Sequence, residues 1–301
     1  MSATSTTDRP DVLDFLLDPM AYGFMQRGLV AAIMVGVVCA VMGAFVVLRG
    51  LAFIGDAVSH AAFPGLVIAY MLGIPLYIGA AVAAVGTSLA IGAVAKRGAL
   101  RFDTAVGVLF AGTFAFGILL FSTIEGFVSD LFSYLLGNVL GITFADIVQV
   151  AVLGLIVLAI VAVLRKELLY ASFDPAGAAA SGLPVQTLDY LLLGLVGVTI
   201  VVSIQAVGII MVVAMLVTPA ATGQLLVDRF WDLVKVAIAV SLVAAISGLY
   251  LSFYLNVASG ASIVLVETLI FGIALVLSPK TGWLGRRRRA RASIAAQPPA
   301  A

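Results

Sequence analysis

The sequence predicts an all-α polytopic membrane protein, and three observations lead to this fold class. Of the 301 residues, 63% are hydrophobic and only 10% are charged, whereas soluble domains carry roughly 25% charged residues. The mean hydropathy is +1.23. The apolar runs are continuous and about 20 residues long, the length that a helix needs to cross the hydrocarbon core. Membrane-spanning strands would instead alternate apolar and polar residues.

We expect nine membrane-spanning helices, each following one apolar run. The runs cover residues 27–49, 54–73, 76–95, 104–122, 145–164, 186–204, 207–226, 232–254 and 259–278. Gly208 and Pro219 interrupt the region 186–226, because glycine and proline weaken or break helices. This region could therefore form one span plus a re-entrant piece, so the prediction is eight or nine transmembrane helices.

The first runs pair into hairpins. Residues 54–73 and 76–95 are joined by a short Gly-Ile-Pro turn, and residues 104–122 and 145–164 form a second hairpin. The segment between the members of this second hairpin mixes aromatic and acidic residues, which suits an interfacial or re-entrant helix outside the cell. Glu125 and Asp130 in this segment could form an outer acidic surface that guides cations or docks a partner; simple solvation explains them equally well.

Basic residues lie between the runs and set the predicted orientation. They cluster at Lys96–Arg101, Arg165–Lys166 and Arg286–Arg291, and basic residues in short loops indicate the cytoplasmic side. The C-terminus is thus predicted to be cytoplasmic. An Arg-rich tail beside a span favours a topological or lipid-surface role over nucleic-acid binding.

The domain organisation follows from these runs. Residues 1–25 form an N-terminal segment, which could lie at the membrane interface. Residues 26–280 form the transmembrane domain, and residues 281–301 form a basic, disordered cytoplasmic tail. The N-terminal segment is acidic and lacks the basic region of a cleaved signal peptide, so we expect the first span to be retained.

One inside loop carries the signals of a short capped helix. Asp174 suits the N-cap position and Pro175 the first helical position. Gly182 suits the residue after the helix, and Pro184 prevents its continuation. We predict a short cytoplasmic helix near 174–182. A plain connector is the simpler interpretation, but a rigid helix here is what a transporter needs to receive a push from a cytoplasmic motor.

Small residues within the runs predict close helix packing. Glycines recur at Gly86, Gly92, Gly107, Gly112, Gly117, Gly194 and Gly197. Cys39 is the single cysteine, which excludes a disulfide within the chain and a cysteine metal cluster. We interpret it as a small packed residue.

The most informative polar pair is Asp56 and His60, at the start of the second run. His60 is the only histidine, and residues four apart share one face of a helix. Ionisable groups inside a membrane segment are costly and by default mark a pathway or binding site. A carboxylate and an imidazole suit a first-row divalent metal. The alternatives are a structural ion pair and an ordinary acid at a helix start.

Three further polar residues lie within spans. Glu267 belongs to the last run and should face the bundle interior, where it could pair with a basic residue or add acidity to a pathway. Thr218 and Thr222 flank Pro219, and a kinked segment there could turn carbonyl oxygens toward a cavity; packing is the plainer interpretation. With one histidine committed to a span, no nucleophile–base–orienter triad can be assembled.

Four stretches in order resemble the permease subunit of manganese/zinc ABC importers, the ABC-3 type. They are residues 55–65 around Asp56 and His60, residues 135–143, the loop around Phe173, Asp174 and Pro175 with Gly182 and Leu183, and residues 208–222. They are spread over most of residues 20–280, and four ordered matches are far more specific than one.

The resemblance implies a homodimer with eight or nine helices per subunit. Two ATPase subunits would dock beneath the coupling helices, which match residues 174–182, and an extracellular or periplasmic binding protein would deliver the metal. Asp56 and His60 match the family's intramembrane metal-contacting pair. The chain has no Gly-x-x-x-x-Gly-Lys-Ser/Thr loop, so it is predicted to be a transport subunit without ATPase activity of its own.

The sequence therefore predicts a multi-pass protein of the bacterial plasma membrane that imports manganese, zinc or iron. No permanently bound cofactor is expected; the metal ion is the cargo. The first alternative is a permease for metal chelates of the siderophore or cobalamin kind, whose wide pathway would need no metal ligands. The second is an ion-coupled secondary transporter, which often shows internal repeats; none is clear here.

Overall fold

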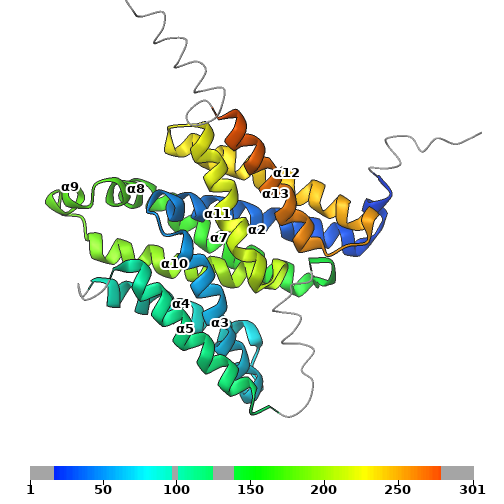
Figure 1. The fold of residues 1–301 in the computed structure, drawn as a ribbon, viewed down its shortest axis with the longest axis horizontal. Helices are drawn as coiled ribbons and strands as arrows, with labels where there is room; N and C mark the ends of the chain where they lie inside the picture. The colour runs from blue at the N-terminus through cyan, green and yellow to red at the C-terminus, as the bar shows by residue number, and fades with distance from the viewer. Residues whose placement is uncertain (1–16, 97–100, 125–138, 279–301) are drawn as a thin grey trace, which may run out of the picture.

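In this computed structural model, residues 17–96, 101–124 and 139–278 are described and form a bundle of helices (Figure 1). The long helices are α2 (Gly23–Leu48), α3 (Ala52–Leu72), α4 (Leu76–Lys96), α5 (Phe102–Phe121), α7 (Phe144–Val163), α10 (Val185–Val207), α11 (Ile209–Leu226), α12 (Phe230–Leu255) and α13 (Ser259–Leu277). The short ones are η1 (Pro19–Ala21), η2 (Val139–Gly141), α8 (Arg165–Phe173) and α9 (Pro175–Ala180). The prediction of an all-α fold is confirmed.

Each predicted run corresponds to one long helix, with ends shifted by a few residues. Within the described ranges, eight helices are long and apolar enough to cross a membrane, and α11 contributes a shorter apolar stretch over Val212–Leu226. The expected count of eight or nine is thereby confirmed. The break between α10 and α11 falls at Gly208, where φ is +86° and glycine is favoured. Pro219 lies inside α11 without ending it.

Helix α2 occupies the middle of the bundle (Figure 1). It packs against α7, α10, α11 and α12, while α3 packs against α4 and α5, and α12 packs against α13. Most of the residues of α5 and α7 are not buried in the single chain. Their outer faces are therefore available to lipid or to another subunit.

Glycine allows some of the helices to touch backbone to backbone. A Cβ at Gly65 of α3 would collide with the carbonyl oxygen of Gly79 in α4, and a Cβ at Gly43 of α2 would collide with that of Leu216 in α11. The predicted role holds for Gly92, Gly117 and Gly197, whose added Cβ atoms would be crowded. It fails for Gly86, Gly107, Gly112 and Gly194, which have nothing within 4 Å of that position.

The two ends of the bundle differ in their number of Lys and Arg residues. The ends of α2 and α4 and the start of α10 meet near α8 and α9, on the left of Figure 1. Because successive helices run in opposite directions, this end also holds the starts of α5 and α12 and the ends of α11 and α13. The Ser278 hydroxyl, just after α13, donates a hydrogen bond of 2.7 Å to the Leu225 carbonyl of α11. The described basic residues at this end, which we call the basic end, are Arg49, Lys96, Arg101, Arg165, Lys166, Arg229 and Lys235. Arg27 alone among the described Lys and Arg residues lies toward the other end.

Candidate functional site

Helix α3 brings Asp56 and His60 together, as their spacing predicts. The His60 Nε2 and Asp56 Oδ1 atoms are 3.5 Å apart, and the two side chains lie one helical turn apart on the same face. Asp56 is 53% exposed and His60 is 23% exposed in the single chain. The carboxylate is therefore open to an incoming ligand, and the imidazole lies partly beneath it.

Aromatic rings of α5 fix the orientation of His60. The centroids of Phe110 and Phe114 lie 5.5 and 5.2 Å from the imidazole centroid, each in an edge-to-face arrangement. The Nδ1 atom of His60 is buried and has no hydrogen-bond partner in the described part of the chain. The packing thus directs Nε2, rather than Nδ1, toward Asp56.

A pocket of about 250 Å³ opens beside this pair, between α3 and α5. Its polar members are Asp56 and Asp103, and the rest of its lining is Phe53, Ala57, Val106, Gly107 and Phe110. Sequence reasoning missed Asp103. An acid in the first turn of a helix is ordinarily explained by the helix dipole, so nothing in the sequence distinguishes this one.

The described part of one chain holds no cluster of side chains that would form a closed metal site. In the described residues, no group of three His, Cys, Asp or Glu side chains comes close enough together to hold a metal ion. Zinc usually takes four ligands and manganese up to six. Among the described residues, the Asp56–His60 pair therefore offers two ligand side chains and no third.

The other predicted pathway residues do not join the pair. Glu267 is fully buried on α13, and neither of its carboxylate oxygens has a hydrogen-bond partner among the described residues. The Thr222 hydroxyl donates to the Thr218 carbonyl, 2.8 Å away within α11. Because this hydrogen bond is local, the packing interpretation of Thr222 is favoured. Glu125 and Asp130, the predicted outer acids, lie outside the described residues, as does the tail 281–301.

The predicted capped helix is present as α9. The Asp174 side chain accepts a hydrogen bond of 2.9 Å from the Gly177 N–H, and Pro175 is the first helical residue. At the other end, Gly182 has φ +82° and donates to the Ala179 carbonyl, while Leu183 donates to the Ala178 carbonyl. These two bonds form a complete Schellman motif. Phe173 is 62% exposed immediately before the cap.

The loop contains more helix than the sequence suggested. Helix α8 follows α7 almost directly after Leu164, and Asp174 joins α8 to α9. A hydrogen-bonding contact of 3.3 Å between the Tyr170 and Ser181 hydroxyls also connects the two short helices. We call α8 and α9 together the α8–α9 module.

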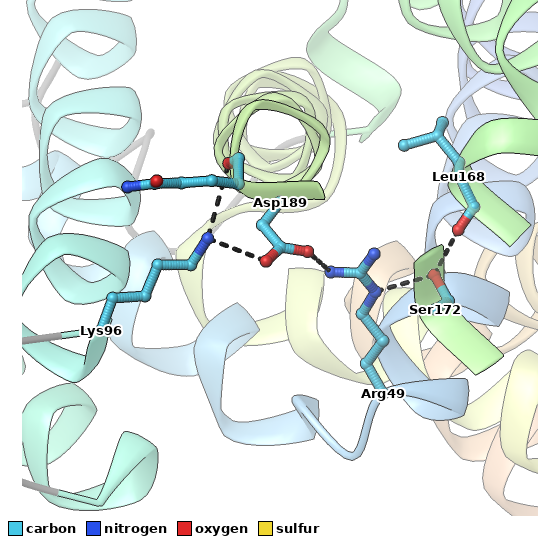
Figure 2. A network of polar contacts seen from close by, with 6 residues as sticks. Arg49, Lys96, Leu168, Ser172 and Asp189 are labelled. Carbon is cyan, nitrogen blue, oxygen red and sulfur yellow. Dashed lines mark hydrogen bonds and ion pairs between the residues drawn. The ribbon is translucent and has the colours of Figure 1, made fainter. Parts of the chain in front are cut away.

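A polar network joins this module to the bundle (Figure 2). Asp189 of α10 forms ion pairs with Arg49 at the end of α2, at 2.7 Å, and with Lys96 at the end of α4, at 2.8 Å. Arg49 Nε also donates to the Ser172 hydroxyl of α8, at 2.8 Å. Sequence reasoning used Lys96 only for orientation, because its meeting with Arg49 on one carboxylate depends on tertiary structure.

A bundle of membrane-spanning helices with an acid–histidine pair on one span has the architecture of a transport protein. The chain belongs to the ABC 3 transport family, whose model matches residues 21–278. It is 44% identical to the manganese transport system membrane protein MntC of Halalkalibacterium halodurans, over 92% of this chain and 97% of that protein. It is 42% identical to the chelated iron transport system membrane protein YfeD of Yersinia pestis, over 88% of this chain and 89% of that protein.

A solved structure shares the fold. PsaBC from Streptococcus pneumoniae, in complex with Fab, superposes with a TM-score of 0.81 at 34% identity, covering 92% of this chain and 99% of the other. Family membership and fold therefore agree.

Proposed function

We propose that this chain is the membrane-spanning permease subunit of an ATP-driven importer for a divalent transition metal, with manganese, iron and zinc as the candidate ions. The Asp56–His60 pair carries the proposal, because its ligand types suit all three ions. The family and the relatives named for manganese and iron transport support it. Two ligands per chain hold an ion weakly, which suits passage better than storage.

A second copy of the chain completes this proposal. Asp56 is half exposed on the outside of the single bundle, and a charged side chain that faced lipid there would be costly. Contact with a partner copy across this face removes that cost. Two copies could then present two Asp–His pairs to one ion.

The basic end suggests how the chain is oriented in the membrane and on which side each partner protein would bind. Lys and Arg near short loops are typical of the cytoplasmic side, and this supports a cytoplasmic position for the α8–α9 module. Two copies of a separate ATPase would bind there, with Phe173, Asp174, Pro175, Gly182 and Leu183 shaping the contact. A metal-binding protein would deliver the ion from the opposite side, at the plasma membrane of a bacterium.

Reconstituted transport tests the proposed function. The chain and its ATPase would be placed in liposomes with the metal-loaded binding protein, and uptake of radioactive manganese, zinc and iron would be measured. We expect uptake that needs ATP and all three proteins. Uptake of chelates but not of free ions would favour a chelate permease, and uptake without ATP would contradict the proposal.

Copurification tests the coupling helix separately. Asp174→Ala together with Pro175→Ala removes the cap and first residue of α9, so less ATPase should copurify with the chain. The matched control is Asp146→Ala, which removes half of the Thr143–Asp146 capping box at the far end of α7. Equal ATPase recovery from both variants would argue against docking at α9.

A further inference from the structure

Three helices, α2, α4 and α10, meet at one carboxylate at the basic end of the bundle. The two oxygens of Asp189 are used by different cations: Oδ1 pairs with Arg49 Nη1 and Oδ2 pairs with Lys96 Nζ (Figure 2). The Asp189 side chain is 23% exposed and that of Arg49 is 14% exposed. Partly buried ion pairs are less screened than surface pairs, so this contact can hold helix ends in place.

Arg49 is the only member of this cluster that also hydrogen-bonds to the α8–α9 module in the described structure. Its Nε atom donates to Ser172, whose hydroxyl donates in turn to the Leu168 carbonyl, at 2.6 Å. Ser172 lies two residues before Asp174, the N-cap of α9. The Arg49 guanidinium is therefore linked by one hydrogen bond to a residue two positions before the N-cap of α9.

Arg49 also lies at the turn between α2 and α3, the helix that carries the candidate metal site. It caps the C-terminus of α2, and Gly50 after it has φ +68°, which places a tight turn before α3. Asp56 lies only four residues into α3, roughly 6 Å along the helix axis at 1.5 Å per residue. A displacement of Arg49 would therefore move the N-terminal end of α3, the helix that carries Asp56 and His60.

The cluster can change partners without leaving a buried charge alone. If Arg49 moves away, Asp189 keeps Lys96, which is further held by the Gln186 carbonyl at 3.5 Å and lies 4.7 Å from the centroid of the Tyr190 ring. Arg49 Nη2 is buried and makes no hydrogen bond within the described ranges. A pocket of about 400 Å³ lined by Arg49, Lys96, Asp189 and Ser172 adjoins the cluster. There is thus room and an unused donor for a second arrangement.

We propose that Arg49 is a positioning residue that couples the α8–α9 module to α3, with Asp189 as its releasable anchor and Ser172 as its link to the module. This inference rests on the proposed function. Switching elements of this kind need two discrete arrangements whose balance a partner can shift. In this protein, the ATPase would shift the balance by moving α9, and Arg49 would transmit the movement to the Asp56–His60 level.

The test measures metal imported per ATP hydrolysed, by the reconstituted complex, for Ser172→Ala, Arg49→Gln and Asp189→Asn. Ser172→Ala removes the link to α8 and leaves the ion pairs intact. We expect a several-fold lower ratio for Ser172→Ala and a larger loss for Arg49→Gln and Asp189→Asn, with ATP hydrolysis retained. Lys96→Gln should lower the ratio less than Arg49→Gln, because Lys96 makes no hydrogen bond to the module in the described structure.

Controls separate coupling from folding. Asp232→Asn and Lys235→Gln break an exposed pair on α12, whose atoms are 2.9 Å apart, and should leave the ratio unchanged. An unchanged ratio for Ser172→Ala and Arg49→Gln overturns the inference. The inference is also overturned if ATP hydrolysis, metal uptake and melting temperature all fall together in both variants, because that result indicates loss of folding. Failure of the unmodified complex to import metal would instead overturn the proposed function.

Discussion

At the scale of single residues, Asp56 and His60 combine ordinary helical spacing with an unusual environment. The 3.5 Å between their facing atoms leaves them close enough to bind one ion. The two phenylalanines of α5 restrain the imidazole, so the proposed metal binding would need little ordering of the His60 side chain. Preorganisation of this kind lowers the entropic cost of binding.

Removing either ligand should slow uptake strongly. Asp56→Asn keeps the size of the side chain and removes its charge, and His60→Gln removes the imidazole. Because loss of even a supporting group around a metal typically costs roughly 10- to 100-fold in affinity or activity, we expect at least a tenfold lower uptake rate. Initial rates of manganese uptake into liposomes would measure it.

The matched control for this prediction is Ser59→Ala. Ser59 lies between the two ligands in sequence but is fully buried, and its hydroxyl donates to the Asp56 carbonyl at 2.9 Å. We expect near-normal uptake from this variant. Unmodified rates for both Asp56→Asn and His60→Gln would remove these residues from the pathway.

Asp103 should act on the ion at a distance. It lines the same pocket as Asp56 but belongs to no three-ligand group, so its charge raises the local cation concentration rather than closing a site. We predict a few-fold higher KM for metal in Asp103→Asn, without a change in kcat. The effect should shrink at high ionic strength because salt screens exposed charges. A change that is insensitive to salt would contradict the electrostatic explanation.

At the scale of elements, the predictable parts are those with local causes. Long apolar runs predict the spans, and Gly208 predicts the break before α11 because the backbone there needs a positive φ. Asp174, Pro175 and Gly182 predict α9 through capping chemistry. Helix α8 was missed because the change from apolar Val163 to polar Arg165 resembles the end of a span, although the helical backbone resumes at once.

Contacts between distant elements could not be predicted in the same way. The Arg49–Asp189 pair joins residues 140 positions apart, and neither residue carries a local signal for the other. Asp103 and Asp56 likewise share a pocket only because α3 and α5 pack together. The sequence thus predicts ligand types, whereas the arrangement of helices decides which of them meet.

Helix contact through glycine gives a stability prediction at the same scale. Gly65→Ala places a methyl group against the Gly79 carbonyl of α4, and overpacking of this kind costs about 1–3 kcal/mol. We expect a melting temperature in detergent that is several degrees lower. The control is Gly86→Ala on α4, where nothing lies within 4 Å of the added atom. Equal melting temperatures for the two variants would show that α3 and α4 do not cross this closely.

At the scale of the whole molecule, the uneven distribution of Lys and Arg predicts which end faces the cytoplasm. The described Lys and Arg residues other than Arg27 lie at the basic end, together with the α8–α9 module. Helix α10 has 23 residues and, at 1.5 Å per residue, separates the two ends by roughly 35 Å. The two ends therefore lie in different compartments, and a chemical probe can tell them apart.

Single-cysteine labelling tests this orientation cleanly, because Cys39 is the only cysteine and is fully buried. Ala180→Cys places a thiol on exposed α9 at the basic end, and Ser122→Cys places one at the exposed end of α5 on the opposite side. With a membrane-impermeant maleimide on intact cells, Ser122→Cys should label and Ala180→Cys should not. Permeabilised cells should label both, which controls for shielding by partner proteins. The reverse pattern in intact cells would place the α8–α9 module outside and make docking of a cytoplasmic ATPase on it impossible.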